Sequence, residues 1–103
     1  MKYWQKLQDP RWQKKRLQIM ERDGFKCRDC SDDKSSLQVH HCAYREEPWD
    51  APNDALMTLC ANCHENRQSA ERATVILLRR AFSKMTVLEI RQLKSFFRAK
   101  LLE

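Results

Sequence analysis

The segment Leu59-Cys60-Ala61-Asn62-Cys63-His64-Glu65 carries two thiols at the spacing of a metal clamp, with an imidazole directly after the second thiol. A second clamp of the same spacing, Cys27-Arg28-Asp29-Cys30, lies upstream. Two CxxC pairs supply the four thiolates that a closed, tetrahedral structural zinc site needs. The sequence therefore predicts a structural Zn²⁺ ion, held by Cys27, Cys30, Cys60 and Cys63.

The length of 103 residues predicts one domain spanning residues 1–103, and a core of this size needs a staple such as zinc. The cysteine number is odd, and the first residues contain no apolar stretch of a secretory signal. We therefore expect zinc rather than disulfides, and a cytoplasmic location. No apolar run approaches the length of a membrane span, so we expect no membrane association.

The charge balance is basic, with 20 Lys and Arg against 14 Asp and Glu and a formal charge of +6. Such a balance is typical of a protein that meets a polyanion, although many small basic domains bind no nucleic acid. Cations in the segment after Pro10 form either a solvated helix face or a surface for the DNA backbone. The candidate phosphate contacts are Arg11, Lys14, Lys15 and Arg67.

The local pattern predicts mixed helix and strand. A helix is expected from Pro10, with Asp9 as its N-cap, to a stop at Gly24. Short strands are expected at Leu37–His40 and Leu56–Leu59, and the CxxCH segment begins a helix. Phe25, Tyr44 and Trp49 are expected to pack into the core, and the fifth thiol, Cys42, to be a small buried residue rather than a metal ligand or redox group.

The C-terminal third predicts two further helices. Residues 69–85 keep helical spacing without a breaker, and the capping box Thr86-Val87-Leu88-Glu89 starts a last helix that runs towards Leu102. The apolar side of that last helix packs either on the domain or against a protein partner, a second copy of the chain included.

All three histidines lie beside or between the clamps, as His40-His41 and His64. A closed four-cysteine site has only a structural role, so any reaction must use other residues, and these imidazoles are the candidates. Consecutive strand residues point to opposite faces, so His40 and His41 can share one site only if the strand bulges or ends there.

The combination of Cys27-x-x-Cys30, Leu37-Gln-Val-His40-His41 and Leu59-Cys60-x-x-Cys63-His64 resembles the zinc-containing HNH endonucleases. The resemblance covers residues 11–68 and leaves residues 69–103 as a helical extension. It implies an α+β fold, a zinc-stabilised ββα-metal (His-Me finger) core with an N-terminal helix and two C-terminal helices. It also implies hydrolysis of DNA phosphodiester bonds.

By position, the resemblance implies that His41 is the general base and that His40 and His64 hold a catalytic divalent metal. Two imidazoles without a carboxylate suit Zn²⁺, Ni²⁺, Co²⁺ or Mn²⁺ better than Mg²⁺, although phosphate oxygens shift that preference. Two positions depart from the family's pattern. Ala55 replaces an asparagine that orients the base, and Gln68 replaces a further histidine.

Three functions therefore remain open. The first is a metal-dependent endonuclease, and the second is a catalytically weak or inactive zinc module on the same scaffold that binds DNA or protein. The third is a thiol redox protein, which the CxxC pairs alone permit but which inert bound zinc excludes.

Overall fold

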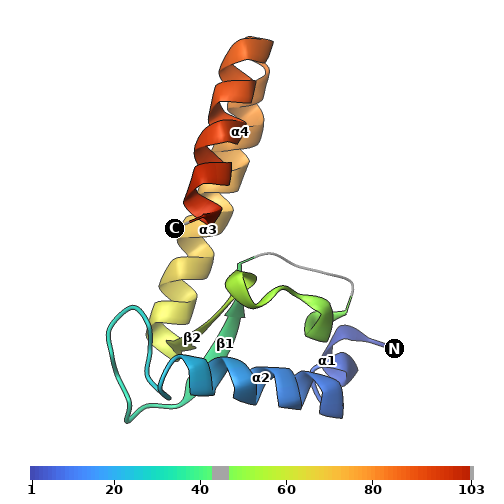
Figure 1. Cartoon of the computed structure of the whole chain (residues 1–103), viewed down its shortest axis with the longest axis vertical. Helices are drawn as coiled ribbons and strands as arrows, with labels where there is room; N and C mark the ends of the chain where they lie inside the picture. The colour runs from blue at the N-terminus through green and yellow to red at the C-terminus, as the bar shows by residue number, and fades with distance from the viewer. Residues whose placement is uncertain (43–46, 103) are drawn as a thin grey trace. The chain divides into compact units, whose positions relative to one another are not determined.

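The computed structural model describes residues 1–42 and 47–102, so the predicted core anchor Tyr44 lies outside the described residues. Within these residues, two α-helices precede a two-stranded antiparallel sheet and two α-helices follow it, as predicted for an α+β chain (Figure 1). The elements are α1 (Tyr3–Lys6), α2 (Pro10–Arg22), β1 (Leu37–His41), η1 (Pro48–Asp50), η2 (Asn53–Ala55), β2 (Leu56–Cys60), α3 (Ala61–Phe82) and α4 (Val87–Leu101).

The chain divides into two compact units, an N-terminal unit of Met1–Arg67 and a C-terminal unit of Gln68–Glu103. The predicted single domain of residues 1–103 stays a prediction. Among the described residues, no helix has both the length and the apolar character required to cross a lipid bilayer.

Helix α2 has the boundaries that its sequence predicts. The Asp9 carboxylate accepts a hydrogen bond from the Arg11 N–H at 2.8 Å, and Pro10 occupies the first turn. The helix ends at Arg22, and Gly24 follows with φ +70°, a conformation that glycine adopts without steric cost. The face that α2 buries carries Trp12, Ile19 and Met20.

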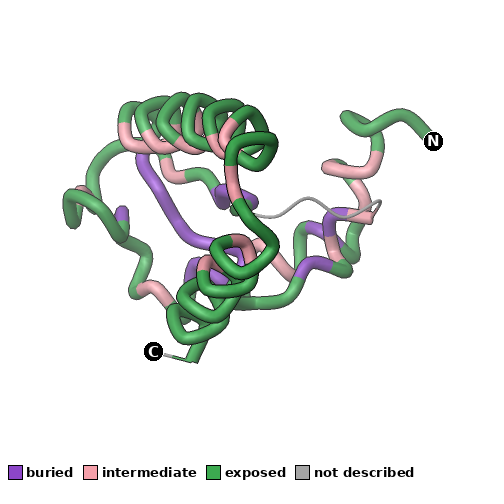
Figure 2. The backbone as a smooth tube through the Cα atoms, turned by 90° about the horizontal axis from the view of Figure 1, so that it is seen from above, coloured by how far each residue is buried: buried purple, intermediate pink, exposed green. Residues whose placement is uncertain are grey.

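Strands β1 and β2 form an antiparallel hairpin with an unbroken register from Leu37 opposite Cys60 to His41 opposite Leu56. Each strand runs one residue further than predicted, because the ladder includes His41 and Cys60. No residue of β2 is exposed, and Figure 2 shows the strands as the most continuous buried part of the backbone.

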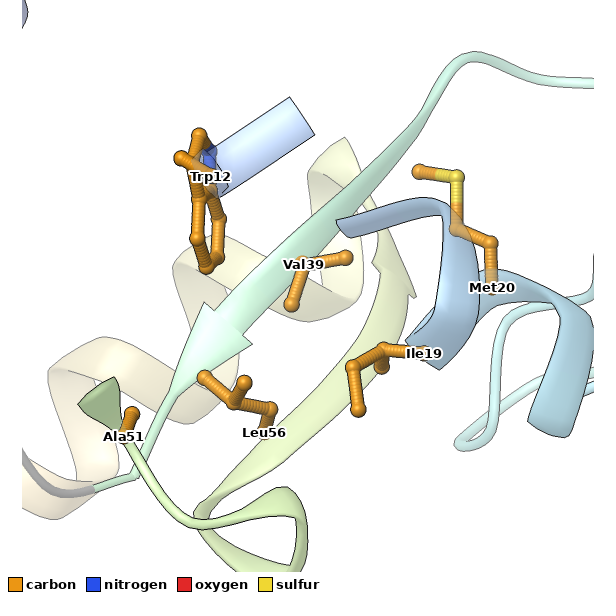
Figure 3. Packing of buried hydrophobic residues seen from close by; sticks show 6 residues of the cluster. All are labelled: Trp12, Ile19, Met20, Val39, Ala51 and Leu56. Atoms are coloured by element: carbon orange, nitrogen blue, oxygen red, sulfur yellow. The ribbon is translucent and has the colours of Figure 1, made fainter. Parts of the chain in front are cut away.

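The core of the N-terminal unit has two clusters of buried residues. The first combines residues of α2 with residues of the hairpin and of the segment between its strands, namely Trp12, Ile19, Met20, Val39, Ala51 and Leu56 (Figure 3). The second combines Cys27, Met57, Leu59 and Cys60. Trp49 packs against the first cluster, as predicted. Phe25 was expected in the core, but it is half-exposed because a positive φ turns the chain outward there.

The C-terminal unit consists of helix throughout, apart from the turn between α3 and α4. Helix α3 starts within the second cysteine clamp and continues to Phe82, so the two helical stretches expected there are one helix. The predicted capping box at Thr86 and Glu89 is present in both directions. No described residue of α4 is buried, although Ile90 and Leu93 on its apolar side are half-buried, so both alternatives for that side stay predictions.

Candidate metal centre

The four clamp cysteines converge as predicted. Cys60 ends β2 and Cys63 lies in the first turn of α3, while Cys27 and Cys30 come from the loop after α2. Their Sγ atoms all lie within 4.8 Å of one another, and those of Cys30 and Cys60 are 3.8 Å apart. With Zn–S bonds of about 2.3 Å, the edge of a tetrahedron of thiolates is about 3.8 Å. The cluster therefore fits a tetrahedral metal such as zinc.

The loop that carries the first clamp is held by backbone hydrogen bonds. The Ser31 N–H donates to the Cys27 carbonyl at 2.8 Å, and the Cys27 N–H donates to the Asp32 carbonyl at 2.9 Å. Ser31 has φ +65°, and the Arg28 N–H donates to the Thr58 carbonyl at 2.9 Å. The turn therefore presents both thiols to one point, and the bond to Thr58 fixes that point relative to β2.

The surroundings of the sulfur atoms favour a thiolate at Cys27. Burial raises the pKa of Cys27, but hydrogen bonds from the backbone of Cys60, Cys30 and Asp29 outweigh it and lower the pKa to about 6. At Cys63 the hydrogen bond with the Cys60 side chain raises the pKa, and burial raises it further. Crowded sulfur atoms keep their protons until a divalent cation neutralises the charge, so these donors suit a thiolate-binding metal.

The fifth thiol, Cys42, is exposed, so the expectation of a small buried residue is wrong. Its Sγ lies 3.8 Å from the Sδ of Met57. Cys42 follows the last residue of β1, and its N–H donates to the Ala55 carbonyl at 2.7 Å. That bond closes the end of the hairpin and leaves the thiol at the surface.

A buried carboxylate, Asp23, links α2 to the hairpin. Its side chain is only 4 % exposed, accepts two hydrogen bonds from Arg22 at 2.9 and 3.0 Å, and accepts a third from the Thr58 N–H at 2.9 Å. The same guanidinium donates to the carbonyls of Asn53 and Leu56, each at 2.7 Å. Burial raises the pKa of Asp23, but the bonds from Arg22 and Thr58 outweigh it and leave the pKa below its usual value.

Two of the three histidines form a pair. His40 on β1 is 1 % exposed, and its ring meets that of His64 on α3 edge to face, with centroids 4.9 Å apart. The pair adjoins the cysteine cluster, because His64 directly follows Cys63 on α3. The two rings therefore lie side by side, and their role as ligands of a catalytic metal stays a prediction.

The third histidine, His41, lies against α2. Its ring stacks on Trp12 at a centroid distance of 4.8 Å and an interplanar angle of 26°. Because β1 has no bulge, His40 and His41 leave the strand on opposite faces. Burial lowers the pKa of His41, the charges of His40 and His64 lower it further, and a hydrogen bond with the Pro48 backbone opposes them.

Ala55 stands at the position where the HNH endonucleases, which the sequence resembles, have an asparagine. Ala55 is buried, and the nearby Asn53 is exposed, with its carbonyl oxygen bonded to Arg22. The orientation of His41 comes instead from Trp12 and the Pro48 backbone. The sequence analysis assigned Trp12 no role at His41, because a stacking partner 29 positions away leaves no local pattern.

Two of the four predicted phosphate contacts already have carboxylate partners. Arg11 forms a bidentate pair with Asp9 at 3.1 and 3.0 Å, and Arg67 forms one with Asp29 at 3.0 and 2.7 Å. Lys14 is exposed and Lys15 is half-buried. The sequence identified all four by charge and position, and charge alone does not show which cations have an acidic neighbour.

An open pocket of about 680 Å³ lies beside Arg11, whose guanidinium covers the ring of Trp49 at 4.0 Å. Lys6 and Arg11 line it together with the carboxylates of Glu47 and Asp50. Lys6 also forms an ion pair with Glu47 at 3.2 Å. Two cations against two carboxylates give the lining no net charge, so the pocket does not favour an anionic ligand.

Comparison of the chain with family models, with curated proteins and with solved structures finds no match. The site is therefore characterised by its own geometry, a four-thiol cluster and a histidine pair held by the loop after α2, the β-hairpin and the helix α3 that follows it.

Proposed function

We propose that the protein is a metal-dependent, HNH-type endonuclease that hydrolyses DNA phosphodiester bonds on a ββα-metal scaffold. The observation that carries this proposal is the joint placement of two donor sets. Four thiols lie at zinc distances, and the rings of His40 and His64 are 4.9 Å apart beside them. A four-thiol site suits a metal that stabilises the fold, and a separate pair of imidazoles beside it suits a metal that takes part in a reaction.

In this proposal Cys27, Cys30, Cys60 and Cys63 hold a structural Zn²⁺ ion, and His40 and His64 hold a second divalent metal. That metal, when bound, neutralises charge on the scissile phosphate and the leaving oxygen. Two imidazoles suit Zn²⁺, Ni²⁺, Co²⁺ or Mn²⁺, and phosphate oxygens would help to bind Mg²⁺. A reducing cytoplasm, which keeps the four thiols available for zinc, is part of the proposal.

His41 is the proposed general base. Its lowered pKa favours the neutral imidazole near pH 7, which is the form that accepts a proton from water. Trp12 holds one face of the ring, and the bond with the Pro48 backbone fixes the rotation of the imidazole. A base with a fixed orientation loses less activity to misalignment, so these two contacts substitute for the missing asparagine.

A second function, a catalytically weak or inactive zinc module that binds DNA or protein, has one observation in its favour. His40 and His41 leave β1 on opposite faces, so the strand by itself does not place the proposed base on the same side as the proposed metal ligand. In this alternative the histidines pack the hairpin against its neighbours, and binding is the whole activity.

The test combines elemental analysis of the purified chain with plasmid nicking in Mg²⁺, Mn²⁺, Co²⁺, Ni²⁺ and Zn²⁺. We expect one tightly bound zinc ion per chain and nicking that depends on an added metal. His41→Ala should abolish nicking and retain the zinc, whereas Gln38→Ala, at an exposed position of the same strand, should nick normally. Saturable DNA binding without nicking in any metal would favour the inactive module.

A further inference from the structure

The positive charge of the chain is concentrated in its C-terminal unit. Residues 68–103 contain eight Lys and Arg and three Glu, a formal charge of +5 out of the chain's +6. Residues 1–67, which carry the cysteine cluster and all three histidines, are almost neutral at +1. A unit of 36 residues with this charge attracts a polyanion far more strongly than the unit that holds the candidate site.

The cations of the two units also differ in their partners. In the N-terminal unit five of the eleven described cations form ion pairs with carboxylates, namely Lys6, Arg11, Arg22, Arg28 and Arg67. In the C-terminal unit seven cations form no ion pair within the part of the chain that the structure describes, namely Arg72, Arg79, Arg80, Lys84, Arg91, Lys94 and Arg98. A cation without a carboxylate neighbour keeps its full attraction for an external anion.

Three of these cations form a stripe along α4. Arg91, Lys94 and Arg98 are spaced i, i+3 and i+7, so they share one helix face, and all three are exposed. At a rise of about 1.5 Å per residue the stripe is about 10 Å long, a span that covers about three successive phosphates of one DNA strand, which lie about 3.4 Å apart along the duplex axis. The apolar residues Ile90, Leu93, Phe97 and Leu101 follow the neighbouring face of the helix.

The charge of the C-terminal unit also indicates which kind of partner this surface binds. Two copies of a +5 unit repel each other, and α4 offers only Glu89 within its described length, where that carboxylate caps the helix. We infer that the Arg91, Lys94 and Arg98 stripe of α4 is the main phosphate-binding surface of the chain and that it takes the backbone of duplex DNA. The inference rests on the proposed function in taking DNA as the polyanion.

The test measures binding of a fluorescent 20-base-pair duplex to the zinc-loaded full-length chain across a salt series, without further divalent metal. One variant combines Arg91→Gln, Lys94→Gln and Arg98→Gln. The matched control removes the same charge from α2 with Lys14→Gln, Lys15→Gln and Arg16→Gln. Glutamine is a good helix former and the three α4 positions are exposed, so the variant should keep its helix, as circular dichroism would verify.

We expect the α4 variant to lose roughly tenfold or more in affinity and to flatten the dependence of log K on log salt by about 2.7, or about 0.9 per lost contact. The α2 control should change that slope by less than about 1. Equal losses in both variants, or a loss confined to the α2 control, would overturn the inference. So would an α4 variant that binds DNA normally but no longer binds anionic phosphatidylserine vesicles or no longer self-associates in sedimentation.

The inference and the nuclease proposal fail in different ways. A chain that binds DNA through α4 but nicks no plasmid in any metal supports the inference and removes the nuclease. A chain that nicks plasmid and whose α4 variant binds as tightly as the wild type retains the nuclease and removes the inference.

Discussion

At the scale of single residues, Asp23 connects more of the N-terminal unit than any residue that the sequence singles out. One carboxylate receives Arg22 and the Thr58 N–H, and Arg22 in turn donates to the Asn53 and Leu56 carbonyls. The end of α2 is thereby bonded to β2 and to the segment before it. A buried carboxylate with its charge neutralised and its oxygens bonded stabilises this junction.

Asp23→Asn should lower the free energy of unfolding by about 2 kcal/mol, because the amide keeps an acceptor for Thr58 but leaves Arg22 without its counter-charge. The lowered pKa means that the carboxylate's contribution is complete above the unfolded value of about 4 and is lost as pH falls through the folded value. Denaturant titrations should therefore give the same difference between about pH 5 and pH 8. A difference that varies over that range would contradict this role.

Trp12 provides the residue-scale test of how His41 is held. If the proposed function is correct, Trp12→Leu should reduce kcat for nicking roughly tenfold or more, because the imidazole loses the ring against which it stacks. Trp12→Phe preserves an aromatic face and should recover most of the rate at similar DNA affinity. The upfield shift of the His41 ring protons in NMR spectra should follow the same order. Equal losses of kcat in both variants would show that Trp12 serves only in packing.

The residue types of the site were predictable, but their partners were not. The four clamp thiols come together as their spacing indicates, because a CxxC segment brings its two thiols to the same side of a turn. The contacts of Asp23 and Trp12 link segments about 30 residues apart in the chain, and no local pattern records such a partner.

At the scale of elements, helix starts were the most predictable features. Asp9 before Pro10 and Thr86 before Glu89 each supply an acceptor for orphan N–H groups, and both helices begin where those residues predict. The short helix α1 was not predicted, because its four residues show no apolar periodicity. The continuity of α3 was also missed, since the sequence separated the CxxCH turn from the stretch after Ser69.

Removal of the α4 cap by Thr86→Ala should lower the free energy of unfolding of the C-terminal unit by about 1 kcal/mol. The hydroxyl accepts a hydrogen bond from the Glu89 N–H at 3.2 Å, and the Glu89 carboxylate accepts one from the Thr86 N–H at 3.0 Å. Ser95→Ala is the matched control within α4, because the Ser95 hydroxyl bonds only a carbonyl of the helix interior. Helicity measured by circular dichroism during thermal unfolding should fall for Thr86→Ala and not for Ser95→Ala.

At the scale of the whole molecule, we expect the proposed zinc ion and the small core to share the stabilisation of the N-terminal unit. Two clusters of four to six buried residues surround the hairpin, and half of the second cluster consists of the metal-binding cysteines Cys27 and Cys60. A core of this size provides only modest stability without a staple. The sequence predicted this dependence from length and cysteine spacing, but no linker or low-complexity segment marks the division into two units.

Chelation of the zinc should therefore unfold the N-terminal unit. Trp4, Trp12 and Trp49 all belong to residues 1–67, so a red shift of tryptophan emission would report on that unit alone, and added Zn²⁺ should reverse the shift. Cys60→Ser should show the unfolded spectrum at the outset, and Cys42→Ser should behave like the wild type. An unchanged spectrum after complete zinc removal would show that the hairpin and α2 fold without the metal.

The surface position of Cys42 has a practical consequence. Thiolates bound to zinc react slowly with alkylating reagents, so a maleimide dye should attach to Cys42 alone while the other four cysteines hold the metal. A dye at that thiol lies two residues after His40 in the sequence. Such a label would report optically on changes at the end of the hairpin. No further cysteine would have to be introduced to attach it.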